Sequence, residues 1–176
     1  QANRTRAMED AAERAASEFT AFLADLIEAR RTSPREDLLT HLIRAEDEGD
    51  RLSQDEMIAT CILLLNAGHE ATVHTLGNGV QACLSQGWQG SDTKTVEEVL
   101  RFDPPLHLFM RWCHTPTTIL GHRFEPGDPV ALLLGAANRD PAVYAEPHIF
   151  DPTRAPGPVS SFGAGIHFCL GHALAR

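Results

Sequence analysis

The residues with the clearest capacity for chemistry lie in a glycine-rich run near the end of the sequence, Phe162 to Gly171. Cys169 follows Gly163 and Gly165 in this run and opens a stretch, 169–176, for which we predict a helix. A thiolate needs positive potential to stay ionised, and the free N–H groups at a helix start supply it. The glycines allow backbone conformations that other residues rarely adopt, and they let a flat ligand approach. The pattern favours a cysteine that holds a haem iron, with a buried free cysteine as the alternative.

The complete run, F-G-A-G-I-H-F-C-L-G, resembles the haem-binding loop of the cytochrome P450 family, whose pattern is F-G-x-G-x-H/R-x-C-x-G. The resemblance implies haem b as cofactor, with the Cys169 thiolate as the ligand of its iron, a ligand that favours O–O cleavage. It also implies that His167 hydrogen-bonds a haem propionate and that Phe162 packs against the porphyrin. The other implied cofactor-binding positions are Gly163, Gly165, Gly171, Arg111 and Ala67.

A charged pair is predicted on a helix earlier in the chain. Glu98 and Arg101 are three residues apart, so their side chains share one helix face and can pair. This spacing alone also fits an ordinary surface ion pair. With the prolines that follow, it resembles the E-x-x-R helix of the P450 family, in which an arginine at the position of Arg154 completes a buried network. The resemblance implies that Glu98, Arg101 and Arg154 hold the cysteine loop in place.

A long apolar helix is predicted from Gln54 onward. Ser53 and Glu56 form the pattern of a capping box at its start. The apolar residues that follow are too numerous for a surface helix, which predicts a central position for it.

Part of this helix, Ala67 to Thr72, resembles the distal-side helix of the same family. The resemblance implies that Gly68 makes room for dioxygen and that Glu70 belongs to a proton-delivery path. A packing glycine is the alternative for Gly68. The family's usual relay threonine is replaced by Ala71, and Thr72 lies about 100° further round the helix, so Thr72 cannot simply take its place.

The substrate pocket is expected from two segments, the distal helix and the chain after the E-x-x-R helix. The resemblance places five residues in its wall: Asn66, His69, His107, Leu108 and Phe109. Arg111 falls where the family places an arginine on a propionate, with a solvent-facing strand arginine as the alternative. The segment Ala137–Pro141 resembles the family's N-R-D-P segment and is expected to brace the approach to the cysteine loop.

Composition restricts the partners and the compartment. The net charge of −9 argues against nucleic acid and anionic membrane surfaces. Four cysteines without paired spacing favour a reducing compartment, and no apolar run has membrane-spanning length. We therefore expect a cytoplasmic protein without a membrane anchor, and the resemblance to the P450 family implies its soluble bacterial type.

The order of elements predicts a mainly α fold with a minor β portion, that is, a partial P450 fold. Helices are expected over 4–31 and 36–45, a turn at 48–50, a polar loop over 85–94, and short strands and loops after 115. We expect one partial haem-thiolate domain over 1–176, with a helical part (1–84), this loop, and a part (95–176) with the E-x-x-R helix and the cysteine. The chain corresponds to less than half of a family member, and the family's N-terminal half and extreme C-terminus have no counterpart in it. We therefore expect self-association or a missing complementary segment.

The resemblance implies a haem-thiolate monooxygenase that inserts one oxygen atom from O2 into a small organic substrate. Electrons would come from NAD(P)H through a ferredoxin reductase and a ferredoxin. A second function stays open from the sequence: a truncated, non-catalytic relative or fragment that acts as a binding module.

Overall fold

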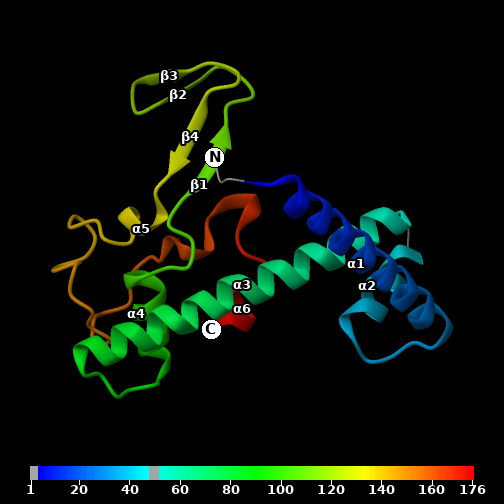
Figure 1. The fold of residues 1–176 in the computed structure, drawn as a ribbon. Coiled ribbons are helices and arrows are strands. Elements are labelled where there is room, and N and C mark those ends of the chain that lie inside the picture. Colours follow the sequence, from blue (N-terminus) through cyan, green and yellow to red (C-terminus); the bar gives the residue numbers. More distant parts are fainter. Residues whose placement is uncertain (1–3, 48–51) are drawn as a thin grey trace. The chain divides into compact units, whose positions relative to one another are not determined.

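The chain is mainly helical with little strand, as the sequence predicts. The computed structural model describes residues 4–47 and 52–176 (Figure 1). The longer helices are α1 (Arg6–Thr32), α2 (Leu38–Asp47), α3 (Gln54–Gln86) and α4 (Thr93–Phe102). Two antiparallel strand pairs follow, β1 (Phe109–Trp112) with β4 (Pro129–Leu132), and β2 (Thr117–Ile119) with β3 (His122–Phe124). The short helical turns are α5 (Leu134–Ala137), η1 (Ser160–Phe162), η2 (Gly165–His167) and α6 (His172–Ala175).

The chain divides into two compact units, each described here by itself. Unit 1 is Gln1–Ala67 and unit 2 is Gly68–Arg176, so the boundary falls within α3. The single partial haem-thiolate domain over 1–176 stays a prediction. Across the described ranges, no helix is both long and apolar enough to cross a membrane.

Unit 1 is held by a small apolar core and by side chains that cap its helices. The core consists of Leu23, Ile27, Ile43, Met57 and Ile58. The capping box at the start of α3 is confirmed, since Ser53 N–H donates to Glu56 Oε2 at 2.8 Å and Glu56 N–H donates to Ser53 Oγ at 3.3 Å. The turn predicted at 48–50 lies outside the described residues.

The starts of α1 and α2 each lie two residues later than predicted. Thr5 accepts a hydrogen bond from Met8 N–H and is the N-cap of α1, so Arg4 lies outside that helix. Before α2, Asp37 Oδ1 accepts from Thr40 N–H at 2.9 Å. Local capping by polar side chains therefore sets both boundaries.

Asp37 makes the stability of unit 1 depend on pH. Its pKa is lowered from 3.8 to about 2, first because Arg30 Nε donates to its carboxylate, and then because Thr40 donates to it. A lowered pKa in the folded state contributes stability above the unfolded pKa, and this is lost as pH falls through the folded value. We expect urea midpoints, followed by helical circular dichroism, to fall between pH 3.8 and about 2 more steeply for the parent protein than for Asp37→Asn. Equal slopes would contradict this prediction.

In unit 2 the second half of α3 packs against α4. Ala82, Val99 and Phe150 are the buried residues of this core, with Trp88 and Phe102 packed beside them. A Cβ at Gly79 would lie 3.0 Å from Val99 Cγ1, so the absence of a side chain there lets the two helices come close.

The loop between these helices is shorter than predicted. It covers residues 87–92 rather than 85–94, because α3 continues to Gln86 and α4 begins at Thr93. Gly87 has φ +66°, a conformation that ends α3, and Asp92 caps α4 by accepting from Thr95 N–H at 2.9 Å.

The sequence predicts a central position for α3, and the structure leaves one side of its unit 2 half exposed. An apolar stripe on its unit 2 half is exposed, and it consists of Val73, Leu76, Val80 and Leu84. The elements that contact this half approach the side that carries Gly79, Ala82 and Cys83. The stripe therefore lies outside the contact between α3 and α4, and its side chains stay exposed in the described part of the chain.

Candidate functional site

A loop that ends at Cys169 is closed on itself by backbone hydrogen bonds. In this Cys loop, residues 162–169, Cys169 N–H donates to the carbonyl of Phe162 at 2.9 Å. Gly163 and Gly165 both have φ +71°, which favours glycine strongly. The two glycines therefore allow the chain to reverse and return the cysteine to the start of the loop.

The helix predicted from Cys169 begins later than expected. α6 covers only His172–Ala175, and the backbone before Cys169 is extended, with Phe168 at φ −55° and ψ 138°. The Cys169 carbonyl accepts instead from His172, both from its backbone N–H at 3.3 Å and from its ring Nδ1 at 2.9 Å. A helix start at the cysteine itself is therefore a wrong prediction, and the loop positions the sulfur without it.

Aromatic and apolar residues flank the cysteine in the sequence. The ring centroid of Phe168 lies 6.4 Å from that of Phe162 and 4.7 Å from that of His172, and both pairs meet edge-on. The guanidinium of Arg176 lies over the Phe162 ring, with Cζ 4.6 Å from the ring centroid. Its Nε also pairs with Glu97 Oε1 at 2.5 Å. Four apolar side chains of this segment are exposed: Ile166, Phe168, Leu170 and Leu174. The sulfur is thus half-buried beside an open apolar surface.

The residues of the Cys loop fit a haem. Within the described part of the chain, Cys169 Sγ has no hydrogen-bond partner, and no three His, Cys, Asp or Glu side chains form a group that could hold a metal. A Cβ at Gly165 would meet nothing within 4 Å, so the space in front of the loop is open. A single cysteine sulfur next to exposed apolar side chains is a donor set that suits a flat, apolar macrocycle with one sulfur ligand.

Two side chains suited to the propionates of such a group are also free of carboxylate partners among the described residues. His167 is exposed on the Cys loop, and Arg111 is exposed on β1. Arg111 Nη1 donates to the carbonyl of Met110 at 3.0 Å, and its guanidinium lies 5.6 Å from the ring centroid of Phe109.

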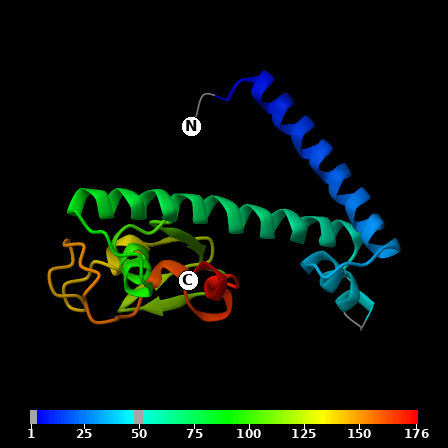
Figure 2. The same ribbon diagram turned by 90° about the horizontal axis from the view of Figure 1, so that it is seen from below.

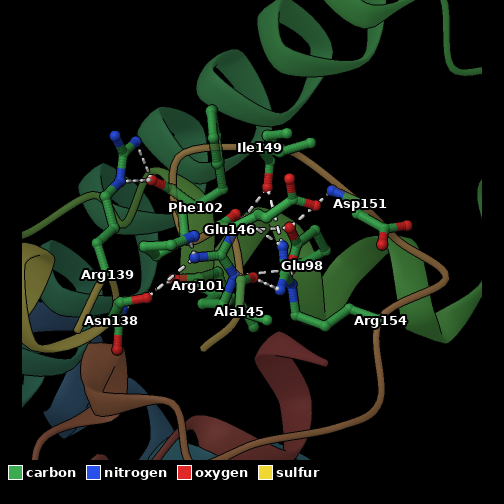
Figure 3. Close-up of polar contacts among 12 residues, drawn as sticks. Glu98, Arg101, Phe102, Asn138, Arg139, Ala145, Glu146, Ile149, Asp151 and Arg154 are labelled. Atoms are coloured by element: carbon green, nitrogen blue, oxygen red, sulfur yellow. Dashed lines mark hydrogen bonds and ion pairs between the residues drawn. The ribbon is translucent and has the colours of Figure 1, made fainter. Parts of the chain in front are cut away.

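The predicted charged network forms on α4, which carries Glu98 and Arg101 (Figure 3). Arg101 is 2% exposed, and its Nη2 and Nε donate to the two oxygens of Glu98 at 2.7 and 2.8 Å. Its remaining donors reach the carbonyls of Asn138, Pro147 and Ile149 at 2.9–3.1 Å. All five N–H groups of the guanidinium are thus used, a geometry that lysine cannot reproduce.

Arg154 and Asp151 complete the surroundings of Glu98. Arg154 Nε lies 3.6 Å from Glu98 Oε2, and its terminal nitrogens donate to the carbonyls of Ala145, Glu146 and Ile149. Asp151 N–H donates to Glu98 Oε1 at 2.8 Å. The structure therefore brings Glu98, Arg101 and Arg154 together, and the carbonyls they bind fix the irregular chain over 145–149.

Two further residues of the site are buried: Asn138, which belongs to the predicted N-R-D-P segment, and Tyr144, which was not singled out from the sequence. Asn138 is fully buried and bonds the residues just before the Cys loop, so its N-R-D-P segment does brace the approach to that loop. The guanidinium of Arg101 lies over the ring of Tyr144, with Cζ 5.2 Å from the ring centroid. The Tyr144 hydroxyl donates to the carbonyl of Pro158. Burial raises the pKa of Tyr144 above its usual value. The N-R-D-P pattern indicated the segment, whereas nothing local distinguished the tyrosine.

The distal residues Gly68, Glu70 and Thr72 are exposed on α3. A Cβ at Gly68 would meet nothing within 4 Å, so a packing role has no partner in the described chain. Glu70 lies 3.9 Å from His74, one helical turn away. The carbonyl of Ala71 accepts from Thr75 Oγ1 at 2.8 Å. Hydrogen bonds between described residues do not connect these side chains to the Cys loop.

The expected pocket residues lie on two elements and are largely exposed. Asn66, Ala67 and His69 are on α3, and Leu108 and Phe109 are at the start of β1, with Phe109 half-buried. His107 Nε2 lies 3.2 Å from Asp103 Oδ1, and the carbonyl of His107 accepts from Gly135 N–H at 3.1 Å. Gly171 precedes α6 and accepts the first hydrogen bonds of that turn.

The comparisons with known proteins agree with one another. Residues 93–176 match the family model described as Cytochrome P450. The chain is 40% identical over 167 residues to "Putative cytochrome P450 YjiB" from Bacillus subtilis (strain 168), which is 90% of this chain and 42% of that protein. It is 45% identical over 165 residues to "Vitamin D(3) 25-hydroxylase" from Pseudonocardia autotrophica, which is 88% of this chain and 41% of that protein. The crystal structure of CalO2 is similar with a TM-score of 0.92 at 34% identity, over 99% of this chain and 46% of that chain. The chain thus spans less than half the length of these relatives.

Proposed function

Because this chain belongs to the cytochrome P450 family, we propose that it carries the cysteine-ligand side of a haem-thiolate monooxygenase. The observation that carries this proposal is the Cys loop. Its two glycines and its closing hydrogen bond present a sulfur without a hydrogen-bond partner at an open apolar surface. A cysteine kept only for packing would be expected in an apolar core instead.

The cofactor would be haem b, held through Cys169. Haem ligated by a thiolate supplies the activation of dioxygen and the insertion of one oxygen atom into an organic substrate. His167 and Arg111 would bind the propionates, and Phe162 would pack against the porphyrin. Gly163, Gly165 and Gly171 would keep the backbone close to the ring.

Glu70 is the proposed proton donor of the distal helix. Its carboxylate is exposed, and its neighbour His74 lies one helical turn away with Nε2 3.9 Å from Glu70 Oε1. Since Ala71 has no hydroxyl and Thr72 points about 100° away from that position, a water or a substrate hydroxyl would carry the proton onward. Gly68 leaves the helix surface open at this point.

The substrate and redox partners follow the same proposal. The proposed wall residues, Asn66, His69, His107, Leu108 and Phe109, combine polar and apolar groups and suit a small organic substrate; all of them are exposed except Phe109, which is half-buried. Electrons would come from NAD(P)H through a ferredoxin reductase and a ferredoxin. A cytoplasmic location stays a prediction.

One observation favours a second function, a non-catalytic binding module. The stripe on α3 formed by Val73, Leu76, Val80 and Leu84 is exposed and apolar, which is typical of a surface that contacts another polypeptide. In that case haem would bind weakly or not at all.

The carbon monoxide difference spectrum of the dithionite-reduced, haem-supplemented protein distinguishes the two functions. We expect a strongly red-shifted Soret band for the parent protein, because the thiolate donates electron density to the iron. Cys169→Ala should lose this band completely. Cys113→Ala should retain it, since Cys113 donates from its thiol to the carbonyl of Thr115 and lies outside the Cys loop. A parent protein without a Soret band, or with an unshifted one, would favour the binding module.

A further inference from the structure

We propose that Asn138 is the positioning residue that fixes the Cys loop to α4 and to the buried charged network. The proposal rests on the function proposed above only because that function gives the Cys loop its role in holding haem. Its structural basis is independent of the cofactor. Asn138 is fully buried and lies directly after α5, and the packing of η1 beside α4 and α5 brings the start of the Cys loop to it (Figure 2).

The side chain of Asn138 bonds the two residues that precede Phe162. Its Oδ1 accepts from Ser160 N–H at 2.7 Å, and its Nδ2 donates to Ser161 Oγ at 2.8 Å. Because a backbone N–H can only donate, the amide oxygen must face Ser160, which fixes the orientation of the amide. The position thus needs an acceptor and a donor together, which the amide supplies and neither a carboxylate nor an aliphatic side chain can.

The hydroxyl of Ser161 extends this contact to α4. Ser161 Oγ donates to the carbonyl of Leu100 at 2.5 Å, and Asn138 Nδ2 lies 3.4 Å from the same oxygen. Leu100 is next to Arg101 in the sequence. Asn138 and Ser161 therefore tie the start of the Cys loop to the helix that carries the charged network.

From these two serines the hydrogen bonds continue to the cysteine. The carbonyl of Ser160 accepts from Gly163 N–H at 2.9 Å, and the carbonyl of Phe162 accepts from Cys169 N–H at 2.9 Å. At the other end, the backbone carbonyl of Asn138 accepts from Arg101 Nη1 at 3.0 Å. One residue thus connects the buried guanidinium of Arg101 with the loop that holds the sulfur.

Amide hydrogen exchange of the haem-free protein tests the proposal at residue resolution. In Asn138→Ala we expect Gly163 and Cys169 N–H to exchange at least about tenfold faster than in the parent, the change that loss of one buried hydrogen bond produces in an opening equilibrium. Val96 N–H, which bonds Asp92 within α4, should keep its parent rate.

Asn78→Ala is the matched control. Asn78 also donates from its amide to a backbone carbonyl, that of Asp103 at 3.1 Å, but it has no contact with Ser160 or Ser161. It should leave exchange at Cys169 unchanged. The proposal is overturned if Cys169 in Asn138→Ala exchanges at the parent rate, if it accelerates only in step with Val96, or if Asn78→Ala accelerates it equally.

Ser161→Ala keeps the test decisive should Asn138→Ala not fold. This variant removes the hydroxyl link to Leu100 and leaves the amide in place. It should accelerate exchange at Gly163 and Cys169 selectively, and the absence of this effect would overturn the proposal.

A spectroscopic measurement separates the role of Asn138 from the proposed function. In the haem-supplemented protein, Asn138→Ala should lower the share of the red-shifted carbon monoxide band at unchanged total haem, whereas Asn78→Ala should not. If the parent itself lacks that band, the monooxygenase proposal fails, and the exchange experiment still decides whether Asn138 positions the loop.

Discussion

Arg101→Ala is expected to destabilise unit 2 by about 3–5 kcal/mol, because it leaves the buried carboxylate of Glu98 without its main partner. The substitution also removes three donors from the carbonyls of Asn138, Pro147 and Ile149. Glu98 is 5% exposed, so water cannot readily replace the lost guanidinium. Arg154 cannot compensate, since its Nε lies 3.6 Å from Glu98 Oε2.

Denaturant unfolding followed by tryptophan fluorescence measures this loss. Both tryptophans of the chain, Trp88 and Trp112, lie in unit 2, so their signal reports that unit. Arg123→Ala is the matched control. It breaks an exposed ion pair with Glu125 at 2.6 Å and should change stability by at most about 1 kcal/mol. Similar losses in the two variants would show that the network does not stabilise unit 2 more than a surface pair does.

Phe150→Ala should destabilise unit 2 by about 3–5 kcal/mol, the cost of removing a buried aromatic side chain and leaving a cavity. Phe150 is 6% exposed and packs with Ala82 and Val99 in the core between α3 and α4. Its ring meets that of Phe102 edge-on, with centroids 5.5 Å apart. The same fluorescence-detected unfolding gives the change in free energy.

Its neighbour in the sequence provides the control for this substitution. Ile149 is 50% exposed, and its contribution to the charged network comes from its backbone carbonyl. Ile149→Ala should therefore cost about 1 kcal/mol or less. A loss for Phe150→Ala no greater than that for Ile149→Ala would contradict the placement of Phe150 in the core.

Features that depend on neighbouring residues could be predicted from the sequence. The capping box of Ser53 and Glu56 and the pairing of Glu98 with Arg101 need only a helix and a spacing of three residues. The mainly helical fold with a minor β portion followed from apolar periodicity and from the position of prolines and glycines. Errors of one or two residues at helix ends arose where a polar side chain caps the backbone, as Asp37 and Asp92 do.

The helix predicted from Cys169 failed for a related reason. The sequence after the cysteine has suitable residues, yet Cys169 N–H bonds back to Phe162, and the chain remains extended just before it. Gly171, at φ −83° and ψ 4°, lies outside the α-helical region, so the regular helix begins only after it. Likewise, the apolar content of α3 did not reveal that Val73, Leu76, Val80 and Leu84 are exposed.

By itself, the sequence determined the chemistry that this protein presents: one cysteine behind two glycines, and a glutamate and an arginine on one helix face. These depend on residue types and short spacings, which are local. Only the tertiary structure decided what holds them, because the partners are distant in the chain. Arg101 bonds carbonyls 37 to 48 residues away, and Ser161 reaches Leu100 across 61 residues. A backbone carbonyl can be supplied by any residue type, and a buried tyrosine or phenylalanine is no different in sequence from one at the surface. The N-R-D-P pattern indicated the segment of Asn138, but the hydrogen bonds of Asn138 and the roles of Tyr144 and Phe150 arise from burial and geometry, which only the folded chain defines.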